Sequence, residues 1–117
     1  MQPYERLEAW RTAHALALEI HRLTRQWPAD ERYGLTAQIR RAAFSVPANI
    51  VEGRARRGPK EFRRFLDIAW ASLAEVEYTL RFARDLGHLS EESFTSLEAL
   101  RTAAAKPLFG LLRSLSR

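Results

Sequence analysis

Residues 33–66, YGLTAQIRRAAFSVPANIVEGRARRGPKEFRRFL, decide the fold and carry almost all of the excess charge. Apolar residues recur at steps of three and four on both sides of Gly58-Pro59, which predicts two helices joined by a tight turn. Residues 32–64 hold nine lysines and arginines against two acidic residues, whereas the rest of the chain is slightly acidic. This concentration of the +5 net charge indicates one basic surface and a polyanionic partner.

Length and composition are those of an ordinary globular chain. The 117 residues, of which 46% are hydrophobic and 28% charged, predict one domain spanning residues 1–117. The absence of cysteine excludes disulfides and thiolate metal sites. The N-terminus is charged where a signal peptide would be apolar, and no run approaches the roughly 18 apolar residues of a membrane span. We therefore expect a cytoplasmic protein without membrane contact.

Working outward from the central stretch, the same spacing predicts two further helices, and no segment alternates as a strand does. The four predicted helices cover residues 4–26, 30 or 31 to 57, 59–86, and a last segment that begins after Ser90 as its N-cap. Four helices of about 20 residues with short connections predict an all-α, antiparallel up-down-up-down four-helix bundle. Pro47 and Pro107 lie inside two of these helices and should each remove a backbone hydrogen bond and kink the helix.

The second and third helices carry more apolar residues than one bundle needs. Each of these helices has a core stripe and, on a different side, a second set of apolar residues. A helix needs only one stripe for its own bundle, so the extra sets predict self-association, although a wide helix could also pack on two neighbours in a monomer. The candidate interface residues are Phe44, Val51, Ile68, Tyr78 and Phe82.

A continuous row of polar residues also follows the second helix. In a hairpin about Gly58, this row would face the third helix, with Arg40 and Arg41 near Glu75, Gln38 near Glu77, and Glu52 near Arg63. Such pairs would fix the register of the two helices, and breaking one from one side costs several kcal/mol. Arg41→Ala should then lower stability more than binding. The predicted polar network comprises Gln38, Arg41, Ser45, Asn49, Glu52, Glu75 and Glu77.

The turn between these helices is the candidate binding site. Arginine presents a planar fork that suits phosphate oxygens, although a basic helix end can also be merely solvated. The sequence has no zinc-finger spacing and no strand with base-stacking aromatics, so we expect contacts mainly to the phosphate backbone of RNA or DNA. The candidate residues are Arg54, Arg56, Arg57, Lys60, Arg63 and Arg64, with Arg40 as a weaker member.

Three stretches, YGLTAQIRRAAFSVPANIVEGRARR, KEFRRFLDIAWASLAEVEYTL and DLGHLSEE, resemble a known family. It is the four-helix bundle family encoded in intervening sequences of bacterial 23S ribosomal RNA genes, also called the S23 ribosomal protein family. The resemblance covers almost the whole chain. It implies a ring-like homopentamer, and it implies neither a catalytic activity nor a settled biochemical role. A related branch, the accessory protein of diversity-generating retroelements, binds a reverse transcriptase and nucleic acid, which adds a reverse transcriptase to the candidate protein partners.

Few residues favour an enzyme. His14 and His21 are two helical turns apart, roughly 10 Å, which is too far for one metal ion, and no Glu-x-x-His pair is present. We therefore predict no metal, no cofactor and no catalytic residue. Arg81 and His88 match the spacing of a class of small helical ribonucleases, but Phe82 replaces the usual polar residue. The main alternative to nucleic-acid binding is a scaffold whose basic turn docks an acidic protein.

Overall fold

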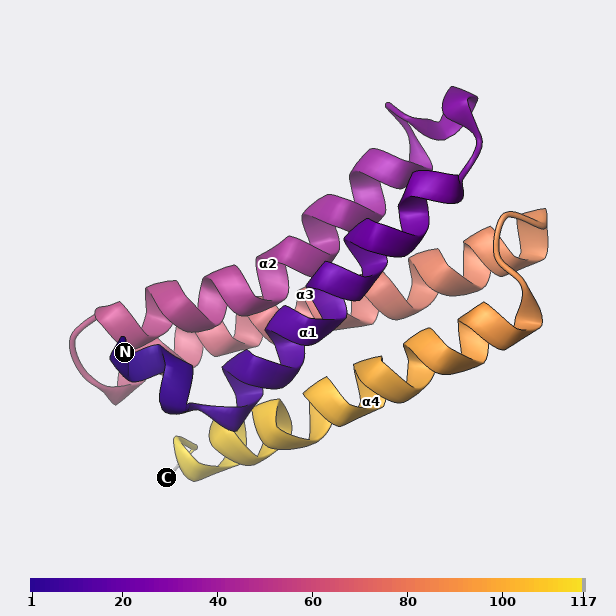
Figure 1. The fold of residues 1–117 in the computed structure, drawn as a ribbon. Helices are drawn as coiled ribbons and strands as arrows, with labels where there is room; N and C mark the ends of the chain where they lie inside the picture. The colour runs from indigo at the N-terminus through magenta and orange to yellow at the C-terminus, as the bar shows by residue number, and fades with distance from the viewer. Residues whose placement is uncertain (117) are drawn as a thin grey trace.

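The computed structural model describes residues 1–116 and contains four long helices around one hydrophobic core. They are α1 (Glu8–Leu23), α2 (Leu35–Ala55), α3 (Pro59–Leu86) and α4 (Glu91–Ser114). Short 3₁₀ turns cover Pro3–Arg6, Thr24–Gln26 and Ala29–Glu31, and residues 1–116 contain no strand. Successive helices run in opposite directions (Figure 1), which agrees with the all-α bundle that the sequence predicted.

Each helix packs against two others. α2 contacts α1 and α3, α4 contacts α3, and α1 closes the bundle on α4. The molecule is elongated, with extents of 43 × 24 × 23 Å, and the α2–α3 turn lies at the same end as the start of α1 and the end of α4 (Figure 1). Within the described residues, every helix is too short or too polar to cross a membrane.

The first two helices are shorter than their apolar patterns predicted. Leu7 has an extended backbone (φ −79°, ψ 124°), which separates the first 3₁₀ turn from α1. α2 begins only at Leu35 because Gly34 is not helical (φ −107°, ψ −109°). The Glu31 carboxylate accepts a hydrogen bond of 3.2 Å from the backbone N–H of Leu35. Glu31 therefore caps α2 from outside instead of lying in its first turn.

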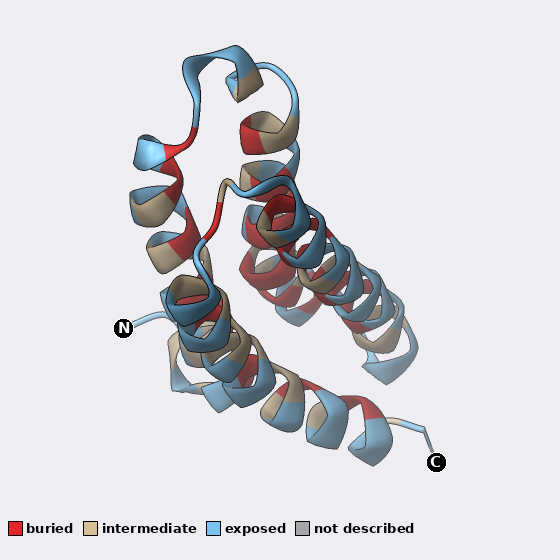
Figure 2. Ribbon diagram, turned by 90° about the vertical axis from the view of Figure 1, so that its right-hand side faces the viewer, coloured by how far each residue is buried: buried red, intermediate tan, exposed pale blue. Residues whose placement is uncertain are grey.

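The core occupies the inner faces of the helices, as the buried ribbon segments of Figure 2 show. The predicted stripes are confirmed in α2 and α3, where residues such as Ile39 and Leu73 are buried. In the other two helices, the buried positions include Leu16 of α1 and Leu112 of α4, while the adjacent Ala17 and Leu111 are only half-buried. Neighbouring positions at the edge of an apolar stripe cannot be ranked until the packing partner is placed.

The two internal prolines do not end their helices. α2 continues through Pro47 and α4 through Pro107. Leu108 and Leu112, which follow Pro107, are both buried. Burial on both sides of a proline maintains the helix because most helical stability in proteins comes from packing. The packing of residues 106–116 is thus settled by the core, and residue 117 lies outside the described part of the chain.

Two glycines shape the α2–α3 hairpin. Gly58 has a φ of +82°, which only glycine adopts without strain, and Pro59 then opens α3. Gly53 lies where α2 and α3 approach closely, since a Cβ placed on it would lie 2.7 Å from the Cβ of Phe65. The hairpin is therefore held close together directly beside the basic residues.

Candidate nucleic-acid interface

Six basic residues lie in the last turn of α2, the connection, and the first two turns of α3. All of them are exposed except Arg63, which is half-buried. The negative end of the α2 dipole and the positive end of the α3 dipole meet here and largely offset each other, so side chains supply the charge. We refer to this set as the basic turn, and its members are Arg54, Arg56, Arg57, Lys60, Arg63 and Arg64.

Three members of the basic turn have an acidic partner three or four residues away in the sequence. Arg56 contacts Glu52 at 3.2 Å, and Arg64 contacts Glu61 at 3.1 Å. Arg63 lies 4.0 Å from Asp67. The hydrogen bond with Arg64 lowers the pKa of the Glu61 carboxyl, and the same bond raises the pKa of Arg64. Exposed pairs of this kind contribute little to stability, but they orient the guanidinium groups.

Phe65 positions two of these arginines further. The guanidinium carbon of Arg56 lies 5.0 Å from the centre of the Phe65 ring, and that of Arg64 lies 4.5 Å from it. The ring itself is buried. Cation–π contact with a fixed ring reduces the freedom of both side chains, while their remaining N–H groups can still donate to phosphate oxygens.

The other three members have no acidic partner. Arg54, Arg57 and Lys60 are exposed, and none forms an ion pair with another residue in 1–116. None of the three is held by a carboxylate in an ion pair, and they are therefore the members best suited to contact phosphate. The sequence predicted all six equally, because which arginines pair with acids depends on side-chain geometry.

Arg40 does not belong to this surface. Its Nε donates to the Thr24 hydroxyl at 2.8 Å, and its Nη2 donates to the backbone carbonyl of His21 at 3.1 Å. It thus satisfies a carbonyl near the C-terminus of α1, and it lies about 21 Å along α2 from Arg54. Arg40 therefore lies apart from the basic turn, and phosphate contact by this weaker candidate stays a prediction.

The predicted polar network is only partly assembled. The hydroxyls of Ser45 and Ser72 lie 2.8 Å apart across the α2–α3 interface, and the Asn49 side chain donates to the Ser45 hydroxyl at 2.9 Å. Gln38 donates to Glu75 at 3.4 Å rather than contacting Glu77. Ser72, which was missed, is therefore the main partner of α2 in this row.

Within residues 1–116, no ion pair between charged members of the network bridges α2 and α3. Arg41 is exposed and forms no ion pair within residues 1–116. Glu52 pairs with Arg56 of its own helix instead of Arg63, and Glu77 pairs with Arg81. The hairpin register is set by small polar contacts and by Gly53, not by the predicted interhelical ion pairs.

Two exposed apolar faces flank α2. One is a groove of about 650 Å³ between α1 and α2, lined by Trp10, Leu18, Phe44 and Val51 among others. Phe44 is 68% exposed there. The other face lies on α3 and contains Ile68, Tyr78 and Phe82, which are all exposed. The five predicted interface candidates thus fall on two different faces.

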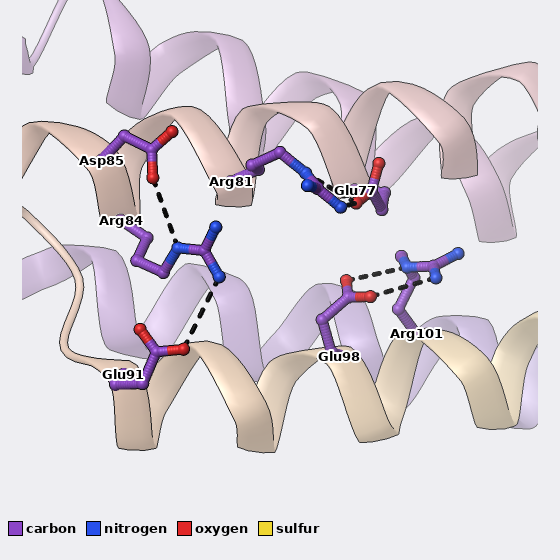
Figure 3. Close-up of polar contacts among 7 residues, drawn as sticks. All are labelled: Glu77, Arg81, Arg84, Asp85, Glu91, Glu98 and Arg101. Carbon is purple, nitrogen blue, oxygen red and sulfur yellow. Dashed lines mark hydrogen bonds and ion pairs between the residues drawn. The ribbon is translucent and has the colours of Figure 1, made fainter.

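Arg81 and His88, the two residues considered for catalysis, contact different partners. Arg81 donates to Glu77 at 2.8 Å (Figure 3), and this bond raises the pKa of Arg81. His88 Nε2 lies 3.0 Å from a Glu31 oxygen. In the same view, Arg84 contacts Asp85 of its own helix and Glu91 of α4, and the second contact ties α3 to α4. The described residues contain no acidic or histidine cluster arranged for a metal ion.

Four packed helices with a charged turn at one end define this chain as a small all-α bundle protein. The family model for the 23S rRNA-intervening sequence protein matches residues 5–110, and the chain belongs to that family. A crystal structure from the S23 ribosomal protein family of Bacteroides thetaiotaomicron VPI-5482, a protein of unknown function, has the same fold, with a TM-score of 0.83. The two are 23% identical, and the match covers 90% of this chain and 95% of that one. No protein with a curated description matches this sequence.

Proposed function

We propose that this protein is a non-enzymatic homo-oligomer that binds the backbone of RNA or DNA through its basic turn. The observation that carries the proposal is the cluster of Arg54, Arg57 and Lys60, which are exposed and lack acidic partners in residues 1–116. Beside them, Phe65 holds the forks of Arg56 and Arg64 in place. A dense set of oriented cations on an otherwise slightly acidic chain is suited to phosphates, with little dependence on base sequence.

We propose further that the oligomer is a closed ring, with five subunits as the family resemblance implies. The two apolar faces that flank α2 differ in residue content, with Phe44 on one and Tyr78 on the other. Two different faces that contact each other between copies make a head-to-tail interface, which forms a ring when the rotation between successive subunits closes. Rotational symmetry would then bring every basic turn to the same end of the ring and multiply the charge that meets a nucleic acid.

Binding of labelled RNA and duplex DNA, followed by fluorescence anisotropy over a range of salt concentrations, tests the nucleic-acid proposal. The triple variant Arg54→Gln/Arg57→Gln/Lys60→Gln should reduce the slope of log K against log salt by about 3 if each side chain neutralises one phosphate. The matched control removes three other exposed arginines, Arg25, Arg32 and Arg41, which lie away from the basic turn. An equal loss of slope in both variants would show a diffuse charge effect and would contradict a localised site.

The oligomer and the alternative function can be tested with the same protein. Light scattering should give a mass of several subunits, and Phe44→Glu should reduce it by placing a charge in the apolar groove. If the intact oligomer binds no nucleic acid at low salt, nucleic-acid binding is replaced by the alternative function. In that alternative the protein is a scaffold whose basic turn binds an acidic protein, such as a reverse transcriptase. The remote ribonuclease alternative requires RNA cleavage that is lost in His88→Ala.

A further inference from the structure

A second groove lies beside the basic turn, between α3 and α4. It has a volume of about 330 Å³, and its lining includes Arg63, Asp67, Trp70, Phe109 and Arg113. Arg63 belongs to both the groove and the basic turn, so the two surfaces are continuous. Lys60 and Trp70 are separated by ten residues of α3, which is about 15 Å along the helix.

Two aromatic side chains in this groove are open to solvent. Trp70 is 39% exposed and Phe109 is 51% exposed. Their ring centres lie 5.8 Å apart with the planes tilted by 46°. Neither ring is part of the core cluster, and large aromatic surfaces left in water commonly mark a binding site. The pair thus offers flat apolar surface that another planar group can cover.

The charges around this aromatic pair select an anionic ligand. Arg63 and Arg113 lie on the two helices that form the groove, while Asp67 is its one acidic lining residue and lies 4.0 Å from Arg63. The exposed aromatic pair Tyr78 and Phe82 differs in this respect, since no charged residue among residues 1–116 lines the pocket beside it. Aromatic surface and arginines therefore occur together beside Trp70.

We propose that Trp70 and Phe109 stack on unpaired bases of a single-stranded nucleic acid whose phosphates contact Arg63, Arg113 and the basic turn. This inference rests on the proposed function and specifies its ligand. Aromatic stacking combined with a basic groove is the usual way to bind single strands without sequence preference, because every base has a flat face. A duplex keeps its bases paired and stacked, so it can use the basic turn but not the aromatic pair. The protein should therefore prefer single strands to duplexes.

The test compares Trp70→Leu with the wild-type oligomer on three labelled probes, namely oligo(dT) and oligo(U) of about 16 nucleotides, and a duplex of equal length. We expect Trp70→Leu to weaken binding of both single strands about tenfold, which is a typical loss for one stacked base, and to leave duplex binding and its salt slope unchanged. Trp70→Phe should restore most of the affinity. The matched control is Tyr33→Leu, which removes an exposed aromatic ring beside Arg32, away from the groove.

Several results would overturn this inference, and they are distinguishable from failure of the proposed function. Unchanged single-strand affinity in Trp70→Leu, or an equal loss for the duplex, would leave phosphate binding intact and remove the stacking role. A smaller oligomer mass in Trp70→Leu would instead identify the groove as a contact between subunits. If the wild-type protein bound none of the three probes, the proposed function itself would fail. A melting temperature close to that of the wild type shows that each variant is folded.

Discussion

At one end of the bundle, α2 and α3 meet at the basic turn. At the other end, Trp27 and Glu31 of the α1–α2 connection lie beside His88 of the α3–α4 connection. The basic end leaves three cations without acidic partners among residues 1–116. At the opposite end the His88 ring lies 3.0 Å from the Glu31 carboxylate, while Trp27 is buried and its ring centre lies 6.3 Å from that of His88.

This difference separates binding from stability. Glu31 accepts a hydrogen bond from the start of α2 and contacts the ring of His88, so these two titratable side chains meet partners within the molecule. The basic turn keeps its unpaired charges in water, where they cost little to maintain and are accessible to a ligand. Changes at the Trp27 end should therefore affect folding, while charge changes at the basic turn should affect binding alone.

The largest loss of stability is expected from Trp27→Ala, at the end of the bundle opposite the basic turn. Removing a buried tryptophan leaves a cavity and costs about 3–5 kcal/mol of unfolding free energy. Trp27→Phe is the matched control, because the Trp27 Nε1 is buried without a hydrogen-bond partner in the described residues and its removal relieves a desolvation cost. Chemical denaturation measures both variants, and similar losses in the two would contradict this account of Trp27.

Gly53→Ala tests the basic end and is expected to have the next largest effect. A methyl group at this position would lie 2.7 Å from the Phe65 Cβ, so α2 and α3 must separate, at a cost of roughly 1–3 kcal/mol. The control is Gly110→Ala, since nothing lies within 4 Å of a Cβ at that position inside α4. It should stabilise the protein by about 0.5–1 kcal/mol. Thermal melts of both variants would show opposite shifts.

Glu31→Gln should change how stability depends on pH, with a smaller effect. The hydrogen bond with His88, and then the one from the Leu35 N–H, lowers the pKa of the Glu31 carboxyl below its ordinary value of 4.5. A lowered pKa in the folded state gives stability that is fully present above about pH 4.5 and is lost as the pH falls through the folded value. Melting temperatures measured between neutral and acidic pH should fall less steeply in Glu31→Gln. An unchanged acid profile would show that the contact is not energetically coupled to folding.

Arg41→Ala is expected to have the smallest effect. The sequence predicted a clear loss of stability because Arg41 was expected to pair with Glu75. The structure gives Arg41 an exposed position without an ion pair in residues 1–116, so the change in unfolding free energy should stay within about 0.5 kcal/mol. A loss above about 2 kcal/mol would restore the sequence-based interpretation. Chemical denaturation of Arg41→Ala and Gly53→Ala under the same conditions compares their losses of unfolding free energy.

The helices and their turn could be predicted from sequence because they depend on local patterns. Apolar spacing, Gly58-Pro59 and the Ser90 cap act within a few residues of the chain, and Ser90 does accept a hydrogen bond from the Ser93 N–H at 3.0 Å. The concentration of charge was likewise visible, because the basic residues are close together in the sequence.

Only the tertiary structure decided which of these residues act together. Arg40 turns toward α1, Glu52 pairs along its own helix, and Trp70 meets Phe109 across nearly forty residues of sequence. The sequence determined that this chain is a four-helix bundle with one basic turn, since helical period and turn chemistry are properties of short segments. Packing decided which cations stay unpaired and which aromatic rings stay exposed, because both depend on the rotation and register of one helix against another.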